Sequence, residues 1–177
     1  MNSRTKRTRL AACTIGLLTA ATLALSTSPA SASGTYSGLA YVYGAGIFQD
    51  DWGNEGIVST SVNTSSNATC LWQKVLWASG LLSSSEIDGV FGNATVTATK
   101  KWQEREGVVP ADGVAGTDTW YNAGIYLIDS DDADTAVDKF AGSKYAANVS
   151  RDSEGRYNFY DGDGIKRLAG YDYRTCS

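Results

Sequence analysis

One short phrase occurs twice in this chain, and it constrains the fold more than any other feature. The sequence reads DGVFG from Asp88 to Gly92 and DGVAG from Asp112 to Gly116. Asp-Gly favours a turn, because glycine tolerates positive φ and the aspartate side chain accepts backbone N–H groups. A threonine follows each phrase, in what reads as the first turn of a helix. We therefore expect two loop-to-helix junctions that frame one central helix.

The stretch that contains both phrases has the apolar spacing of three helices. The first begins at a capping candidate, Ser66 or Asn67, has apolar residues at a 3.6-residue period and stops at Gly80. The second runs from Asn93 to Gly107, and a third, shorter helix follows the second phrase. A three-helix domain over residues 67–127 is the expected result.

The regions on either side of these helices differ from them in composition and residue pattern. Residues 33–66 are rich in Gly, Ser, Thr and Tyr without a clear period, which indicates an N-terminal arm. Residues 134–177 contain short aromatic stretches separated by the turn sequences RDSEG and DGDG, which predicts a small antiparallel β extension. The expected fold class is therefore α+β, with a helical module followed by a β-rich C-terminal extension.

The first 32 residues have the pattern of a secretory signal peptide. Basic residues at positions 4, 6, 7 and 9 precede an apolar run, which ends in the small-residue sequence ASA at Ala30–Ala32. The apolar run is shorter than the roughly 20 residues that a bilayer span needs. We expect cleavage after Ala32 and a secreted protein, either extracellular or associated with the cell wall.

Without this leader the chain is acidic. Four of its 15 Lys and Arg residues leave with the leader, so 11 remain against 19 Asp and Glu residues, a net charge of −8. Nucleic acids and anionic membranes bind clustered basic residues, so neither is an expected partner. The remaining 145 residues suffice for one ordinary domain, and we expect a monomer.

Two cysteines remain after the leader, Cys70 and Cys176. In an exported chain they have one possible intramolecular pairing, which would tie the C-terminus to the first helix. In the chain-entropy model, closing a loop of this length stabilises the folded state by on the order of 4–5 kcal/mol. The alternative is a bridge between two chains.

Three motifs together resemble those of a known family. WQKVLWASG follows the pattern L-Q-x-x-L-x-x-x-G, with Trp72 in place of the usual leucine. DGVFGNATVTATKKWQEREG follows D-G-x-F-G-x-x-T-x-x-A-x-x-x-F-Q-x-x-x-G, with Trp102 in place of phenylalanine. ADGVAGTDTW follows the closing D-G-x-x-G-x-x-T-W. Roughly a third of the chain is thus similar to the small three-helix peptidoglycan-binding domain of bacterial cell-wall enzymes and exported proteins.

The resemblance implies a non-catalytic module that docks on peptidoglycan, through the glycan or the stem peptide. Most signature residues are expected to serve the fold, so the surface near the two turns, with the side chains of Asp88 and Asp112, is the candidate ligand site. Trp72 departs from the family pattern and Trp77 lies off the predicted core face, so either ring is a candidate for stacking on a sugar. The alternative is that the C-terminal extension, held beside Cys70, covers both rings.

Enzymatic function has one candidate residue. The chain has no histidine, which excludes Ser-His-Asp, Cys-His and histidine-ligated zinc sites as they are usually built. Paired carboxylates can hydrolyse a glycosidic bond, and Glu55 in FQDDWGNEG has suggestive neighbours, because a nearby tryptophan can raise the pKa of a carboxyl. We expect a protein that is not an enzyme and has no cofactor. The alternatives are a small carboxylate-dependent cell-wall glycan hydrolase, and an interaction or inhibitor protein that keeps the fold without glycan affinity.

Two acidic tracts raise the question of a calcium site. DSDDAD, at Asp129–Asp134, lacks the glycine and the glutamate that a twelve-residue calcium loop places at positions six and twelve. DGDG, at Asp161–Gly164, is too short for such a loop. A hairpin turn and surface charge explain these tracts better, and we expect no metal.

Overall fold

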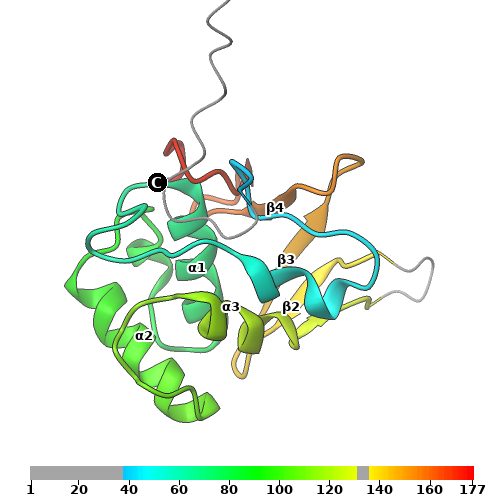
Figure 1. The fold of residues 1–177 in the computed structure, drawn as a ribbon. Helices are drawn as coiled ribbons and strands as arrows, with labels where there is room; N and C mark the ends of the chain where they lie inside the picture. The colour runs from blue at the N-terminus through cyan, green and yellow to red at the C-terminus, as the bar shows by residue number, and fades with distance from the viewer. Residues whose placement is uncertain (1–37, 131–135) are drawn as a thin grey trace, which may run out of the picture.

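The structure is a computed structural model that describes residues 38–130 and 136–177. Three α-helices form one side of the molecule and a five-stranded antiparallel sheet forms the other (Figure 1), so the α+β fold class is confirmed. The predicted signal peptide, residues 1–32, and most of the tract Asp129–Asp134 lie outside the described residues. Within the two described ranges, no helix combines the length and apolarity that a bilayer crossing requires.

The helices begin close to the positions that the sequence predicts. They are α1 (Asn67–Ala78), α2 (Asn93–Glu106) and α3 (Thr117–Gly124), and two 3-10 helices, η1 (Phe48–Asn54) and η2 (Ser84–Glu86), accompany them. Ser66 caps α1 by accepting a hydrogen bond from Thr69 N at 3.0 Å. Gly107 ends α2 with a φ of 73°, which favours glycine. α3 is shorter than expected, because Leu127 belongs to the first strand instead of the helix.

α1 is the most buried helix of the fold, whereas the helix that the two DGV phrases frame is α2. The sequence pattern indicated one inner face, yet eleven of the twelve residues of α1 are buried. α2 packs on one side of this helix, while β2 and β3 of the sheet contact it as well. A helix with neighbours on several sides has little exposed face, and this explains why even Lys74 is 9% exposed.

The sheet is an antiparallel meander, as the alternating turns and aromatic stretches predicted. Its strands are β1 (Leu127–Ile128), β2 (Lys139–Ala141), β3 (Ala146–Arg151), β4 (Tyr157–Tyr160) and β5 (Lys166–Leu168), in that spatial order. Alternate residues such as Phe140, Val149 and Phe159 are buried and turn toward the helices. The sequence DGDG forms the turn between β4 and β5, where Asp161 Oδ1 accepts hydrogen bonds from the backbone N–H groups of Asp163 and Ile165.

The segment before α1 belongs to the core. Trp52, in η1, is fully buried and meets the ring of Trp120 edge-on at 5.2 Å. Trp120 in turn meets Trp72 at 5.2 Å, and Trp72 meets Trp102 at 5.3 Å. This chain of four indole rings joins η1 to all three α-helices. On its other side the Trp52 ring stacks near Phe140 of the sheet, so the described residues share one core.

The last residues of the chain cover the N-terminus of α1. The backbone N–H groups of Asn67 and Ala68 donate to the carbonyls of Tyr173 and Gly170, both at 2.8 Å. The disulfide between Cys70 and Cys176, which the two-cysteine count predicted, holds the end of the chain beside the same helix. Two of the N–H groups that a helix leaves unpaired at its start are therefore satisfied by the C-terminal tail, residues 170–177, and that of Thr69 is satisfied by Ser66.

Candidate functional site

The loop that contains the first DGV phrase is held by one side chain, that of Gln73 in α1. Its Nε2 donates to Asp88 Oδ1 at 2.8 Å, to Val90 O at 3.0 Å and to Thr95 Oγ1 at 3.1 Å. Its Oε1 accepts a hydrogen bond from Gly89 N at 2.7 Å. A single buried amide therefore ties the turn to both the helix before it and the helix after it.

The second DGV phrase is held in the same way by Gln103 in α2. Its Nε2 donates to Asp112 Oδ1 at 3.1 Å, to Val114 O at 2.9 Å and to Thr119 Oγ1 at 3.0 Å, and its Oε1 accepts from Gly113 N at 2.8 Å. The sequence repeat is thus a structural repeat, in which a helical glutamine holds the loop that starts the next helix. These two arrangements are called the Gln73 clamp and the Gln103 clamp below.

The aspartates of the two turns are exposed but partly used by the fold. Asp88 Oδ1 and Asp112 Oδ1 each accept a second hydrogen bond, from the backbone N–H groups of Val90 and Val114, both at 2.9 Å. One carboxylate oxygen of each residue therefore shapes the turn. What remains for a ligand is the other oxygen, at the solvent-facing edge of each loop.

The surroundings of the two turns differ. At the first turn, Arg174 Nη1 donates to Asp88 O at 2.8 Å. A Cβ added at Gly89 would lie 2.6 Å from Cys176 Sγ, so the C-terminal tail rests directly on this turn. The tail therefore covers the Gly89 side of the first turn and leaves the Asp88 side chain exposed.

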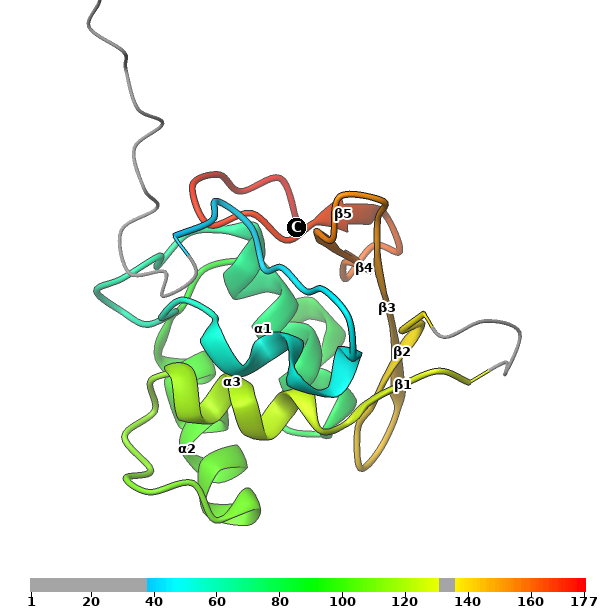
Figure 2. The same cartoon turned by 45° about the vertical axis from the view of Figure 1, so that its right-hand side comes forward.

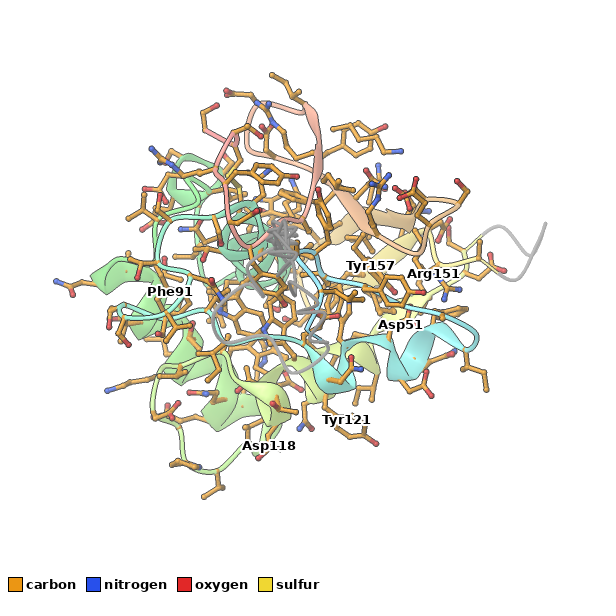
Figure 3. All side chains as sticks on the ribbon, turned by 45° about the horizontal axis from the view of Figure 1, so that its top comes forward. Asp51, Phe91, Asp118, Tyr121, Arg151 and Tyr157 are labelled. Carbon is orange, nitrogen blue, oxygen red and sulfur yellow. A yellow bond between two sulfur atoms is a disulfide. The ribbon has the colours of Figure 1, made fainter. Side chains whose placement is uncertain are left out.

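The second turn borders an open pocket of about 260 Å³. Its lining includes Asp112, Gly116, Thr117 and Asp118, together with Val108–Pro110 from the loop after α2. Val109 is 83% exposed at its rim, and Figure 3 shows Asp118 projecting from α3 at the edge of the molecule. The sequence singled out Asp112 here but missed the other lining residues, which become neighbours only when the Gln103 clamp closes the loop.

Trp72 lies in the middle of the indole chain and offers no surface to a sugar. It is fully buried, and its Nε1–H donates to Thr99 Oγ1 of α2 at 2.9 Å. Its two nearest rings belong to Trp102 and Trp120, so the helices themselves, more than the C-terminal extension, cover it.

Trp77 is partly buried, and its ring already has two partners within the protein. Tyr145, from the turn between β2 and β3, stacks on it with a centroid distance of 4.8 Å and an interplanar angle of 19°. Lys74 Nζ lies 4.2 Å from the ring centroid. The alternative that the C-terminal extension covers this ring matches what the structure places there, and a sugar would first have to displace Tyr145.

Glu55, the residue of the hydrolase alternative, is fully buried. Its Oε1 accepts from Tyr43 N at 2.8 Å and its Oε2 from Tyr171 Oη at 2.6 Å. Burial raises the pKa of this carboxyl from 4.5 to about 7, against the lowering effect of those hydrogen bonds. Both oxygens are used inside the fold, so a glycan has no path to this acid in the structure.

A second buried carboxylate stands near the first. Asp51 accepts a short hydrogen bond from the hydroxyl of Tyr157 in β4 and lies 3.4 Å from the guanidinium of Arg151 in β3. Figure 3 shows these three residues together where η1 meets the sheet. Burial raises the pKa of Asp51, although the tyrosine and the arginine oppose that shift. Asp51 therefore fastens η1 to the sheet, and Glu55 fastens the same N-terminal segment to Tyr171 in the C-terminal tail.

Comparison with known proteins bears on the helical part of the chain. Residues 65–121 match the family model described as a putative peptidoglycan binding domain, which confirms the resemblance drawn from the three motifs. The match covers 57 of the 177 residues and includes both glutamine clamps but none of the sheet. Neither the curated proteins nor the solved structures contain a match to the chain.

Proposed function

We propose that this is a secreted, non-catalytic peptidoglycan-binding protein that contacts the cell wall through the pocket beside the second turn. The family match supports peptidoglycan as the partner. The observation that carries the choice of surface is the asymmetry of the two clamps, because the C-terminal tail covers the first turn while the second opens onto the pocket.

The pocket offers groups that suit an amino sugar or a stem peptide. The carboxylate of Asp118 makes no hydrogen bond or ion pair to another described residue, and one oxygen of Asp112 remains outside the turn. These acceptors can take amide N–H or ammonium groups, in which the wall peptide is rich. Thr117 Oγ1 is buried and has no partner in the described part of the chain, so it can donate to a ligand carbonyl. Val109 and Pro110 add an apolar rim.

Gly116 provides a sharp test of this pocket. It lines the pocket, and a Cβ added there meets nothing within 4 Å, so the position accepts a side chain and Gly116→Tyr adds the bulk of a ring at the pocket. Gly92 occupies the corresponding position before α2, and a Cβ there meets only Val90 O at 4.0 Å, so Gly92→Tyr is the matched control.

The measurement is co-sedimentation with purified, insoluble peptidoglycan. We expect wild type and Gly92→Tyr to sediment alike, and Gly116→Tyr to stay in the supernatant with an unchanged melting temperature. Equal sedimentation of both variants would move the binding site away from this pocket. A wild-type chain that never sediments would instead favour the interaction or inhibitor protein.

The absence of catalysis is tested on the same material. We expect no release of soluble muropeptides by the wild-type chain over a long incubation, because the one suggestive acid, Glu55, is enclosed by the fold. Release that persists in the wild type and stops in Glu55→Gln would establish the hydrolase. Secretion is tested separately, since the mature protein recovered from outside the cell should begin at Ser33.

A further inference from the structure

The outer face of the sheet is a separate feature of this molecule. The helices gather on one side of the sheet in both views (Figures 1 and 2), and the buried residues of the strands turn toward them. The opposite face carries the alternate residues of β2 to β5. None of these strands belongs to the segment that matches the peptidoglycan-binding family, so the proposed function leaves this face without a role.

Four side chains form a row straight across this face. Lys139 of β2 pairs with Asn148 of β3, and Tyr160 of β4 pairs with Lys166 of β5. The pairing of β3 with β4 places Val149 opposite Phe159, and one residue further in the same register Asn148 stands opposite Tyr160. The row therefore reads Lys, Asn, Tyr, Lys. Neighbouring strands lie about 4.8 Å apart, so the backbone positions of its two lysines are about 14 Å apart across the sheet.

The row lines a hollow and its polar groups are largely unused. All four side chains border a pocket of about 240 Å³. Within the described chain, the side chains of Asn148, Tyr160 and Lys166 make no hydrogen bond or ion pair, and Tyr160 is 41% exposed. Lys139 Nζ donates one hydrogen bond, to Ser130 Oγ at 2.5 Å, and an ammonium group has three N–H donors. By contrast, the hydroxyls of the tyrosines at positions 126, 157, 171 and 173 are all hydrogen-bonded.

The charge of the hollow differs from that of the chain as a whole. Among the described residues that line the hollow, Lys139 and Lys166 face one carboxylate, that of Asp138, which accepts from the backbone N–H and the hydroxyl of Ser130. The described lining thus carries a net positive charge, on a chain with a net charge of −4. The two lysines stand at opposite ends of the row, so a small anion leaves the groups between them without a partner. An extended chain with several negative groups can reach both.

We propose that this hollow binds an acidic saccharide chain, which lies across the strands from Lys139 to Lys166. The two ammonium groups pair with its carboxylate or phosphate substituents, and the amide of Asn148 hydrogen-bonds its hydroxyl groups. The ring of Tyr160 contacts the apolar face of a sugar unit. The site is independent of the helical pocket, so a chain that fails to bind peptidoglycan through the second turn can still bind here.

The test uses full-length mature protein, with hyaluronan octasaccharide as the probe for carboxylates. We expect binding by isothermal titration, weakened by added salt because the contacts are charged. Lys139→Gln with Lys166→Gln in one chain should lower the affinity by at least about tenfold, and Tyr160→Ala should lower it as well. A phosphate-bearing polysaccharide in a second arm distinguishes the two kinds of anionic group.

The matched control is Lys100→Gln with Lys101→Gln, which removes the same charge from exposed positions of α2. Equal loss in the control pair would reduce the effect to net charge and overturn the site. Neutral chitohexaose that binds as tightly as the acidic probe, or polyglutamate that binds more tightly, would also overturn an acidic saccharide as the ligand. Unchanged melting temperatures exclude misfolding as the cause of any loss, since both lysines of the row lie at the surface.

Discussion

Tyr171 Oη donates a hydrogen bond of 2.6 Å to Glu55 Oε2, and so joins two residues 116 positions apart in the chain. The same hydroxyl accepts a hydrogen bond from Gly56 N at 2.9 Å, so it both donates and accepts within the fold. Because the contact is buried, it links the N-terminal segment to the C-terminal tail in a place where water does not compete. The ionisation of Glu55 is therefore coupled to folding.

The first prediction is that stability falls as the pH rises. The pKa of Glu55 is about 7 in the folded chain and 4.5 when unperturbed. Because the pKa of Glu55 is higher in the folded chain, its carboxyl stabilises the folded state in full below pH 4.5. This stabilisation is lost as the pH rises through 7. This difference between the two pKa values corresponds to about 3 kcal/mol of unfolding free energy. Glu55→Gln is neutral at every pH and close in shape to the protonated acid, with an Nε2–H that donates to Tyr171 Oη in the reverse direction, so its unfolding free energy in urea should stay nearly constant between about pH 5 and pH 8. A wild-type curve that rises over this range would contradict the coupling.

The second prediction concerns the glutamine clamps. Gln103→Met keeps the length of the side chain but leaves Gly113 N without its acceptor and Val114 O with only the longer bond from Thr119 Oγ1, and a buried unpaired N–H is costly. We expect a loss of about 2–4 kcal/mol in unfolding free energy, and the same for Gln73→Met. Glu104→Ala, at an exposed neighbouring position of α2, should change it by less than about 0.5 kcal/mol. Clamp variants as stable as this control would show that the loops hold their shape without the amides.

The third prediction isolates the contact between the tail and the first turn. Gly89 and Gly107 have nearly equal positive φ values, 70° and 73°, so alanine strains the backbone at both, by about 1–2 kcal/mol. A Cβ at Gly107 meets nothing, whereas one at Gly89 collides with Cys176 and Arg174. Gly89→Ala should therefore be the more destabilising by thermal denaturation, by an additional amount of about 1–3 kcal/mol. Equal losses would mean that the tail moves aside freely.

The fourth prediction separates burial from binding at Trp72. Trp72→Phe keeps an aromatic ring in the core but loses the hydrogen bond to Thr99, which should lower stability by about 1–3 kcal/mol. Since the indole has no exposed surface, co-sedimentation with peptidoglycan should be unchanged. A folded Trp72→Phe chain that no longer sediments would restore this ring as a ligand contact.

The local architecture of the helical part could be predicted from sequence, because its determinants are near one another in the chain. Gln73 and Thr95 lie on the two helices that flank the first turn, and each belongs to one of the three family motifs. The meander was equally readable from its turn sequences. These features depend on propensity and short-range hydrogen bonds, which a single sequence records directly.

The surroundings of the site could not be predicted, since they depend on contacts between distant segments. No period marks Trp52 as a core residue within a glycine-rich stretch, yet the indole chain requires it. Likewise, Arg174 contacts the first turn from 86 positions away, and nothing in either DGV phrase distinguishes a covered copy from an open one. Trp77 is a further example, because Tyr145, which stacks on its ring, belongs to a distant segment of the chain.

The edge-on contact between Trp52 and Trp120 limits how this protein can be engineered. A fragment trimmed to the family boundaries, residues 65–121, lacks Trp52 and the sheet. The Trp120 indole and the sheet-facing side of α1 would then be exposed to water. Such a fragment would tend to aggregate instead of serving as a portable wall-targeting tag. Fusion partners should therefore be attached to the intact mature chain, with its own N-terminal segment and closing cysteine retained.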